Sequence, residues 1–198
     1  MNDSDDYNSH MKIISFEVSN SIKVIAKQHA QERISFEYDR FGLDRQKRIK
    51  MVEMGTLGQL IFREYLEKEK IEYTFEFQAG EYDQKDFEIF DNIVEIKTSG
   101  YSENEGYRDL NAIYNFDQMQ QAEAKNIHIS VQIFVNGYKK SDKKFDIDNC
   151  NSAHIVGFST IDELRNSDLK HLPFGKAYLK PLKELREIGS LEKFLKED

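Results

Sequence analysis

The residues best suited to chemistry are two acids and a lysine in the segment 85–99, KDFEIFDNIVEIKTS. Successive residues of a strand point to opposite faces of a sheet, so Glu95 and Lys97 share one face while Ile96 points into the core. Asp86 begins the segment that would form the partner strand of a hairpin. We therefore expect two carboxylates and one ammonium group to meet on a polar face at one end of an otherwise apolar sheet.

These groups suit the metal-assisted hydrolysis of a phosphodiester. The carboxylates of Asp86 and Glu95 are the hard oxygen ligands that Mg²⁺ prefers, and Mg²⁺ also keeps waters and binds substrate phosphates. The backbone carbonyl of Ile96 could add a third protein ligand. The ammonium group of Lys97 can orient the attacking water or stabilise the hydroxide formed from it. Mg²⁺ is the expected cofactor, and Mn²⁺ is expected to substitute for it.

Two strands must hold this group. Residues 86–90 and 93–98 alternate apolar with polar side chains on either side of the turn-forming pair Asp91-Asn92, which predicts a hairpin. Apolar residues at helical spacing predict a helix over 49–70 ahead of it. Gly55 and Gly58 lie on the apolar face of that helix, where we expect close packing to compensate for their cost to helix stability.

Periodicity and turn residues predict the other elements: helices over 18–38, 116–125 and 181–196, strands over 71–78, 127–135 and 154–158, and a short helix capped by Thr160. This mixture predicts an α/β (α+β) protein with a central mixed β-sheet flanked by helices.

The order Asp86, a turn, and then Glu95-Ile96-Lys97 on the next strand resembles the motif of the PD-(D/E)xK nucleases, which include many restriction endonucleases and archaeal Holliday-junction resolvases. The resemblance implies a restriction endonuclease-like fold in which Asp86 and Glu95 bind the metal and Lys97 positions water. It covers about residues 50–188, within a single nuclease domain expected over 11–198 after a flexible tail over 1–10. Only the Asp86, Glu95 and Lys97 part is specific.

The resemblance is less complete upstream and downstream of the motif. Family members often carry a glutamate near the start of the preceding helix, and Gln59 holds that position here. Its amide can position a water but adds no charge to a metal site, so Glu53, near the predicted helix start, is the alternative ligand. In some members a glutamine of the following helix reaches the active site; the candidates here are Gln118, Gln120 and Gln121.

The composition is that of an ordinary folded protein, with 198 residues of which 39% are hydrophobic and 32% charged. No stretch approaches the roughly 20 consecutive apolar residues of a membrane-spanning helix, and the polar N-terminus shows no secretory signal. The single cysteine, Cys150, excludes a multi-cysteine metal site. We expect a cytoplasmic (intracellular) protein with no membrane partner.

The net charge of −8 is opposite to the basic footprint usual in nucleic-acid-binding proteins. Basic residues nevertheless cluster in 40–50 and in 139–144, and either cluster could contact phosphates as well as solvent.

The sequence therefore predicts a Mg²⁺-dependent endonuclease that acts on DNA rather than RNA. A homodimer is a further hypothesis, because cutting both strands of a duplex requires two sites. One alternative is a catalytically degenerate nuclease fold that binds nucleic acid or a protein partner without cleaving it, which Gln59 and the acidic charge favour. An exonuclease is another. The intact set of Asp86, Glu95 and Lys97 argues against the degenerate protein, because crowded polar groups are costly unless they hold a metal.

Overall fold

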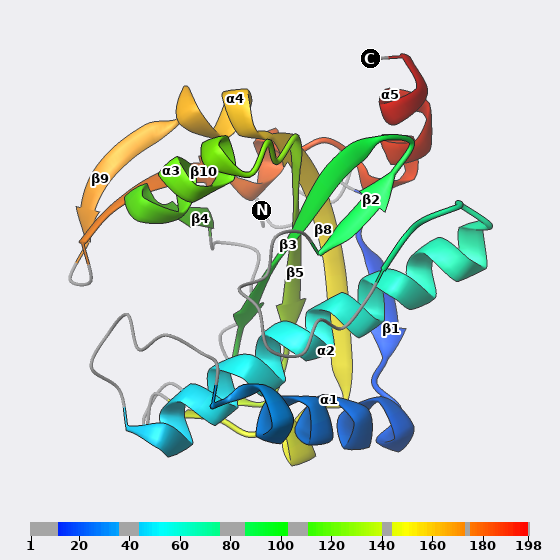
Figure 1. Ribbon diagram of the computed structural model, residues 1–198, viewed down its shortest axis with the longest axis vertical. Coiled ribbons are helices and arrows are strands. Elements are labelled where there is room, and N and C mark those ends of the chain that lie inside the picture. Colours follow the sequence, from blue (N-terminus) through cyan, green and yellow to red (C-terminus); the bar gives the residue numbers. More distant parts are fainter. Residues whose placement is uncertain are drawn as a thin grey trace, which may run out of the picture.

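A five-stranded mixed sheet forms the centre of the molecule (Figure 1). The computed structural model describes residues 12–35, 44–75, 86–102, 111–139, 144–172 and 175–197. In spatial order the strands are β1 (Ile14–Glu17), β8 (Ser152–Thr160), β5 (Ile129–Val135), β3 (Asn92–Gly100) and β2 (Phe87–Ile89). β3 and β5 are parallel and the other neighbours are antiparallel. The predicted class, a mixed sheet flanked by helices, is confirmed.

Two helices cover one face of this sheet, α1 (Asn20–Arg33) and α2 (Arg45–Glu69) (Figure 1). Leu57 and Ile61 of α2 are fully buried in one core cluster with Val94 of β3, and burying each such side chain contributes about 1.5–3 kcal/mol. The helix starts earlier than predicted because the Asp44 carboxylate caps it, accepting a 2.9 Å hydrogen bond from the backbone N–H of Lys47.

The contact between α2 and β3 is tightest at Gly58. A Cβ added there would lie 1.8 Å from Oγ1 of Thr98, whereas one added at Gly55 would meet nothing within 4 Å. Close packing therefore explains Gly58 as predicted, and the same prediction is wrong for Gly55.

This difference gives a matched pair of variants. Gly58→Ala should lower the free energy of unfolding by about 1–3 kcal/mol, because β3 must shift to admit the methyl group. Gly55→Ala should raise it by about 0.5–1 kcal/mol through helix propensity alone. Urea titrations of both variants measure the two changes, and equal stabilisation by both would show that the α2–β3 spacing is not fixed at Gly58.

The β2–β3 hairpin forms as predicted, but its turn lies one residue earlier than Asp91-Asn92. Ile89 pairs with Asn92, which leaves a two-residue loop. Phe90 and Asp91 accordingly have positive φ angles of 48° and 64°, as the tight turns that match strand twist require. On the outer side of β2, Thr74 forms an isolated antiparallel bridge with Glu88. The strand predicted over 71–78 is therefore wrong for 71–75, where only this bridge forms, and residues 76–78 lie outside the described residues.

The sequence did not predict a second sheet, which lies against the other face of the first. Its order is β4 (Asn111–Asn115), β10 (Gly175–Pro181) and β9 (Asp168–Leu172). Helices α3 (Phe116–Ala124) and α4 (Ile161–Arg165) join it through a core cluster that includes Tyr114, Met119 and Leu164. α3 and the Thr160 cap of α4 are as predicted.

The predicted helix over 181–196 is wrong in its first half. β10 continues to Pro181 and is followed by the single turns η3 (Leu182–Glu184) and η4 (Ile188–Ser190), and only α5 (Leu191–Glu197) is an α-helix. Arg186 lies between these turns and pairs with Phe158 of β8 through backbone hydrogen bonds of 2.8 and 3.0 Å. The neighbouring Gly157 allows this approach, since its Cβ would lie 2.5 Å from the Arg186 carbonyl oxygen. The remaining short elements are β6 (Tyr138–Lys139), β7 (Lys144–Phe145) and η2 (Ile147–Asn149).

Glu163 on α4 links the two sheets. Its carboxylate accepts hydrogen bonds from Ser159 (2.7 Å), Lys180 (3.3 Å) and Arg186 (2.6 and 2.8 Å). Burial opposes its ionisation, but the hydrogen bonds from Arg186 and Ser159 and the charges of Lys180 and Arg186 prevail and lower the pKa of Glu163 to about 2.

Glu163→Gln should therefore destabilise the protein at neutral pH by about 1 kcal/mol, since partial exposure screens these ion pairs. Because the folded-state pKa lies below the ordinary value of 4.5, the wild-type advantage is present above that pH and is lost as the pH falls toward 2. Unfolding curves of both proteins between pH 2 and 7 measure it. A difference that does not change with pH would contradict this account.

Candidate active site

Asp86 lies immediately before β2, against an edge of β3 that β2 leaves open. Its Oδ2 accepts a 2.6 Å hydrogen bond from the backbone N–H of Ile96, and its Oδ1 accepts one of 2.7 Å from Nε2 of Gln59. One carboxylate thus joins the α2 helix to the strand that carries Glu95 and Lys97. The side-chain amide of Gln59, which occupies the family's glutamate position, therefore contacts Asp86.

The backbone of Ile96 faces the same edge. Pairing between β2 and β3 ends where Phe87 meets Val94, and beyond it the N–H of Ile96 donates to Asp86 instead of to a strand. The N–H and C=O of one strand residue point to the same side. The carbonyl of Ile96 therefore faces the edge where the Asp86 carboxylate lies, as a third ligand would need to do.

Glu95 and Lys97 project together from β3, with Oε1 of Glu95 and Nζ of Lys97 separated by 2.5 Å. Their side chains are only 22% and 16% exposed. Tyr114 of β4 completes the group: its hydroxyl donates to Oε2 of Glu95, and Nζ of Lys97 lies 4.5 Å from its ring centroid. Tyr114 was not predicted from the sequence, where the available signal was a short apolar run, Ala112-Ile113-Tyr114, between two asparagines.

The charge of Glu95 affects the ionisation of its neighbours. Burial and the charge of Glu95 raise the pKa of Asp86 to about 6, although the Ile96 N–H, the charge of Lys97 and the Gln59 amide oppose the rise. Burial and the charge of Glu95 also raise the pKa of the Tyr114 hydroxyl, which therefore stays protonated and remains a donor. The site thus carries negative charge that a bound cation would stabilise.

Strand β5 places two further polar residues next to Glu95 and Lys97. In the parallel register Glu95 pairs with Ser130 and Lys97 with Gln132, and both partners are buried. Nε2 of Gln132 donates to the Lys97 carbonyl at 3.1 Å.

The glutamine that contacts Lys97 is Gln132, which lies on strand β5. The predicted candidates were on the helix that follows the motif. Of the three candidates on the following helix, Gln118 accepts a 3.3 Å hydrogen bond from the backbone N–H of Asn115 at the start of α3. Gln120 and Gln121 are exposed.

Glu53 lies on α2 six residues before Gln59, which is about 9 Å along the helix axis. Its buried carboxylate is 2.8 Å from Nζ of Lys50. The structure therefore joins Gln59 to Asp86, Asp86 to the backbone of Ile96, and Lys97 to Glu95, while the described contact of Glu53 is with Lys50. Its assignment as a metal ligand stays a prediction.

The donors fit Mg²⁺. Asp86, Glu95 and the Ile96 carbonyl supply three oxygens, and Mg²⁺ takes the rest of its octahedral shell from water and substrate phosphate. Across the described ranges, no group of three or more His, Cys, Asp or Glu side chains is placed to hold a metal ion. A metal at this edge would therefore depend on the main-chain carbonyl as well as on the two carboxylates.

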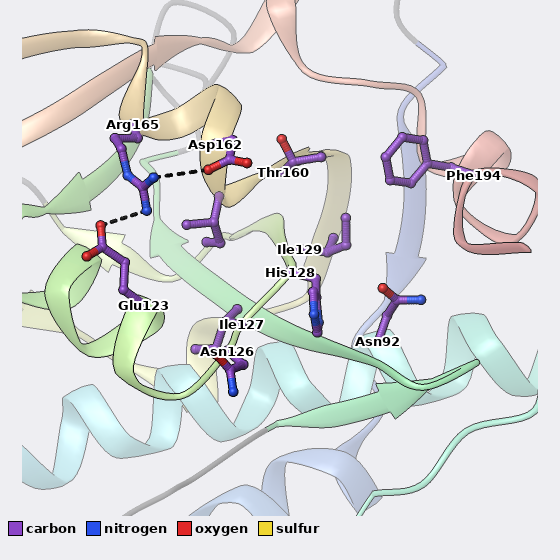
Figure 2. Close-up of a pocket in the computed structure, with 11 residues that line it drawn as sticks. Asn92, Glu123, Asn126, Ile127, His128, Ile129, Thr160, Asp162, Arg165 and Phe194 are labelled. Atoms are coloured by element: carbon purple, nitrogen blue, oxygen red, sulfur yellow. Dashed lines mark hydrogen bonds and ion pairs between the residues drawn. The ribbon is translucent and has the colours of Figure 1, made fainter. Parts of the chain in front are cut away.

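A separate concavity of about 600 Å³ lies where β3 and β5 begin, between Asn92, His128 and Phe194 (Figure 2). Figure 2 shows the guanidinium group of Arg165 held between Glu123 and Asp162, at 2.7 and 3.2 Å. The residues that line it do not include the carboxylates or the lysine of the site. Its arginine is neutralised within the pocket, so we assign it no role in the chemistry.

Comparisons with protein-family models, curated proteins and solved structures found no match for this chain. In the described part of the chain, no helix is both long and apolar enough to cross a membrane. The geometry and chemistry of the site are therefore the basis for a functional proposal.

Proposed function

We propose that this protein is a metal-dependent nuclease that hydrolyses phosphodiester bonds, and that it acts as an endonuclease on DNA. The observation that carries the proposal is the convergence of Asp86, Glu95 and Lys97 at one edge of β3, where the Ile96 carbonyl also faces. Oxygen ligands for a divalent cation lie beside a partly exposed ammonium group, which is the combination that phosphodiester hydrolysis requires.

The order of elements around this edge supports the resemblance to PD-(D/E)xK nucleases. A helix, α2, precedes the hairpin and contributes Gln59. The hairpin carries Asp86 on one arm and Glu95 and Lys97 on the other. α3 then leads to β5, which lies parallel to β3.

Each residue has a distinct role in the proposed reaction. Asp86 and Glu95, with the Ile96 carbonyl, would hold Mg²⁺, and Gln59 fixes the orientation of Asp86. Mg²⁺ bound there would stabilise charge on the phosphate and lower the pKa of a water. Lys97, held beside Glu95 and over the Tyr114 ring, orients the attacking water and stabilises the negative charge that develops.

A second candidate is a nuclease-like protein that binds nucleic acid or a protein partner without cutting. Hydrogen bonds within the site favour it, because Asp86 and Glu95 each accept them on both carboxylate oxygens. The neutral amide of Gln59 at the family's glutamate position favours it too. Each carboxylate oxygen has two lone pairs, however, so these hydrogen bonds still leave room for a cation.

A cleavage assay separates the two candidates. Purified protein is incubated with supercoiled plasmid, single-stranded DNA and RNA, each with Mg²⁺, Mn²⁺ or EDTA. Nicked or linear plasmid in Mg²⁺ and Mn²⁺, and none in EDTA, is the result expected of an endonuclease, whereas shortening from free ends alone would indicate an exonuclease. No cleavage of any substrate, with no Mn²⁺ binding by calorimetry, would favour the non-catalytic protein. The proposal includes a homodimer, which a monomeric mass in solution with full double-strand cleavage would contradict.

A further inference from the structure

We propose that the β9–β10 hairpin binds double-stranded DNA as a two-stranded ribbon lying in a groove of the duplex. The inference rests on the proposed nuclease function and names the surface that would hold the substrate. Figure 1 shows the two strands extending together away from the central sheet, in orange at the upper left. β9 is the edge strand of its sheet.

Three of the five exposed side chains of this hairpin are basic, the others being Asp168 and Leu169, in a chain whose net charge is −8. Lys170, His171 and Lys176 are all exposed, and Lys176 lies directly opposite His171 in the register. Two basic side chains in that arrangement offer each other no attraction. Within the described residues neither is paired with an acid, and Lys170 has only an exposed 3.6 Å pair with Asp168, which contributes little. Among the described residues no close or buried ion pair neutralises these basic side chains, whereas the phosphates of a bound duplex would.

The basic groups lie on both faces of the ribbon. His171 and Lys176 share one face, and Lys170, which pairs with Ala177, points to the other because successive strand residues alternate. A ribbon that is basic on both faces suits a groove, where a phosphate backbone runs along each side. The major groove of B-DNA is about 12 Å wide and admits a two-stranded ribbon. The five residues of β9 span about 17 Å, which is long enough to cross it.

The hairpin is joined to the proposed active site through one strand. Tyr178 of β10 pairs with Tyr114 of β4, and Tyr114 contacts both Glu95 and Lys97. Lys176 lies two residues before Tyr178 on the same face, about 7 Å along the strand. DNA held by the ribbon would therefore be fixed relative to Glu95 and Lys97 through the paired strands β10 and β4 and the side chain of Tyr114.

The test measures binding rather than cleavage. A fluorescein-labelled 30-base-pair duplex is titrated by anisotropy in EDTA and in Ca²⁺, at several KCl concentrations. Lys170→Glu/Lys176→Glu should weaken binding at least 10-fold, and the corresponding double alanine variant should reduce the slope of log K against log[KCl] by about 2, one for each phosphate that a lysine no longer neutralises. The matched control is Lys68→Glu/Lys193→Glu, which makes the same change in net charge at exposed positions near the C-terminal end of α2 and on α5, both of which lie at the right of Figure 1. It should change the Kd by less than threefold.

Three results would overturn the inference while leaving the nuclease proposal intact. The first is wild-type cleavage of plasmid together with unchanged duplex binding by the ribbon variant. The second is an equal loss of affinity in the ribbon and control variants, which would indicate only a general charge effect. The third is an equal loss of affinity by the ribbon variant for single-stranded DNA, which would contradict binding in a duplex groove. A wild-type protein that neither binds nor cuts nucleic acid would instead overturn the nuclease proposal itself. Thermal unfolding checks that each variant is folded.

Discussion

Lys97→Ala should lower the rate of Mg²⁺-dependent plasmid cleavage by about 10²- to 10⁴-fold, the range measured when a positioned catalytic group or charge-stabilising donor is removed. In the structure Nζ of Lys97 lies 2.5 Å from Glu95 and over the Tyr114 ring, with 16% of its side chain exposed. The lysine is therefore held in place and still accessible to a substrate. Single-turnover assays with supercoiled plasmid measure the effect without a contribution from product release.

Lys180→Met is the matched control for this variant. Lys180 is also a largely buried lysine, 8% exposed, that is paired with a carboxylate, Glu163, at 3.3 Å. Removing it abolishes a partly buried ion pair outside the site, so the cleavage rate should stay within about threefold of the wild-type rate. A Lys97→Ala protein that is folded and cleaves as fast as the wild type would exclude the proposed mechanism. Equal losses in both variants would indicate a structural effect.

Asp86→Asn should abolish cleavage and, in EDTA, make the folded protein more stable at pH 8. The pKa of Asp86 is raised to about 6 in the folded protein, from an ordinary value of 3.8, chiefly by burial and by Glu95. A carboxyl group whose pKa is raised by folding stabilises the protein most below its ordinary pKa, and that stability is lost as the pH rises through 6. Each pKa unit corresponds to about 1.4 kcal/mol. Because asparagine does not ionise, the variant should have a free energy of unfolding roughly 1–3 kcal/mol higher than the wild type above pH 7.

The geometry allows asparagine to keep both hydrogen bonds. Its Oδ1 can accept a hydrogen bond from the Ile96 N–H. Its Nδ2 can donate one to Gln59 if the Gln59 amide rotates by about 180° and presents its oxygen. Urea unfolding in EDTA from pH 4 to 8 should show a stability difference that grows across this range. Adding Mg²⁺ should then stabilise only the wild-type protein, because ligand binding to the folded state raises stability.

Asp162→Asn is the control for this experiment. Asp162 has a side chain that is 81% exposed, so its replacement should change stability by no more than about 0.5 kcal/mol. An Asp86→Asn protein less stable than the wild type at pH 8 would show that the carboxylate is stabilising as it stands and that the site stores no unfavourable charge.

The local part of the site could be predicted from the sequence because its parts lie close together in the chain. A two-residue turn places Asp86 opposite the strand that carries Glu95 and Lys97, and the alternation of side chains in that strand assigns both residues to one face. Periodicity also located α2 and β5, since each has a long run of apolar residues at one spacing, and α3, which is shorter. The position of Gln59 next to Asp86 follows once α2 packs on β3.

The second sheet could not be predicted in this way. β4 and β10 are separated by some 60 residues, and their pairing depends on contacts between distant segments that no local pattern encodes. The apolar residues after Pro181 recur at nearly helical spacing, yet the backbone pairing of Arg186 with Phe158 keeps residues 185–187 extended between two single turns. Tertiary hydrogen bonds there outweigh a weak helical preference.

The amino-acid sequence by itself determined that this protein has a mixed sheet flanked by helices and that two acids and a lysine share one edge of it. Short-range geometry is sufficient for both. Only the tertiary structure decided what surrounds those residues: Tyr114 on Glu95 and Lys97, Gln59 on Asp86, and Glu53 paired with Lys50. These contacts set the charge and the accessibility of the site, and they depend on how separate segments pack together, because burial and neighbouring charge exist only once the chain has folded.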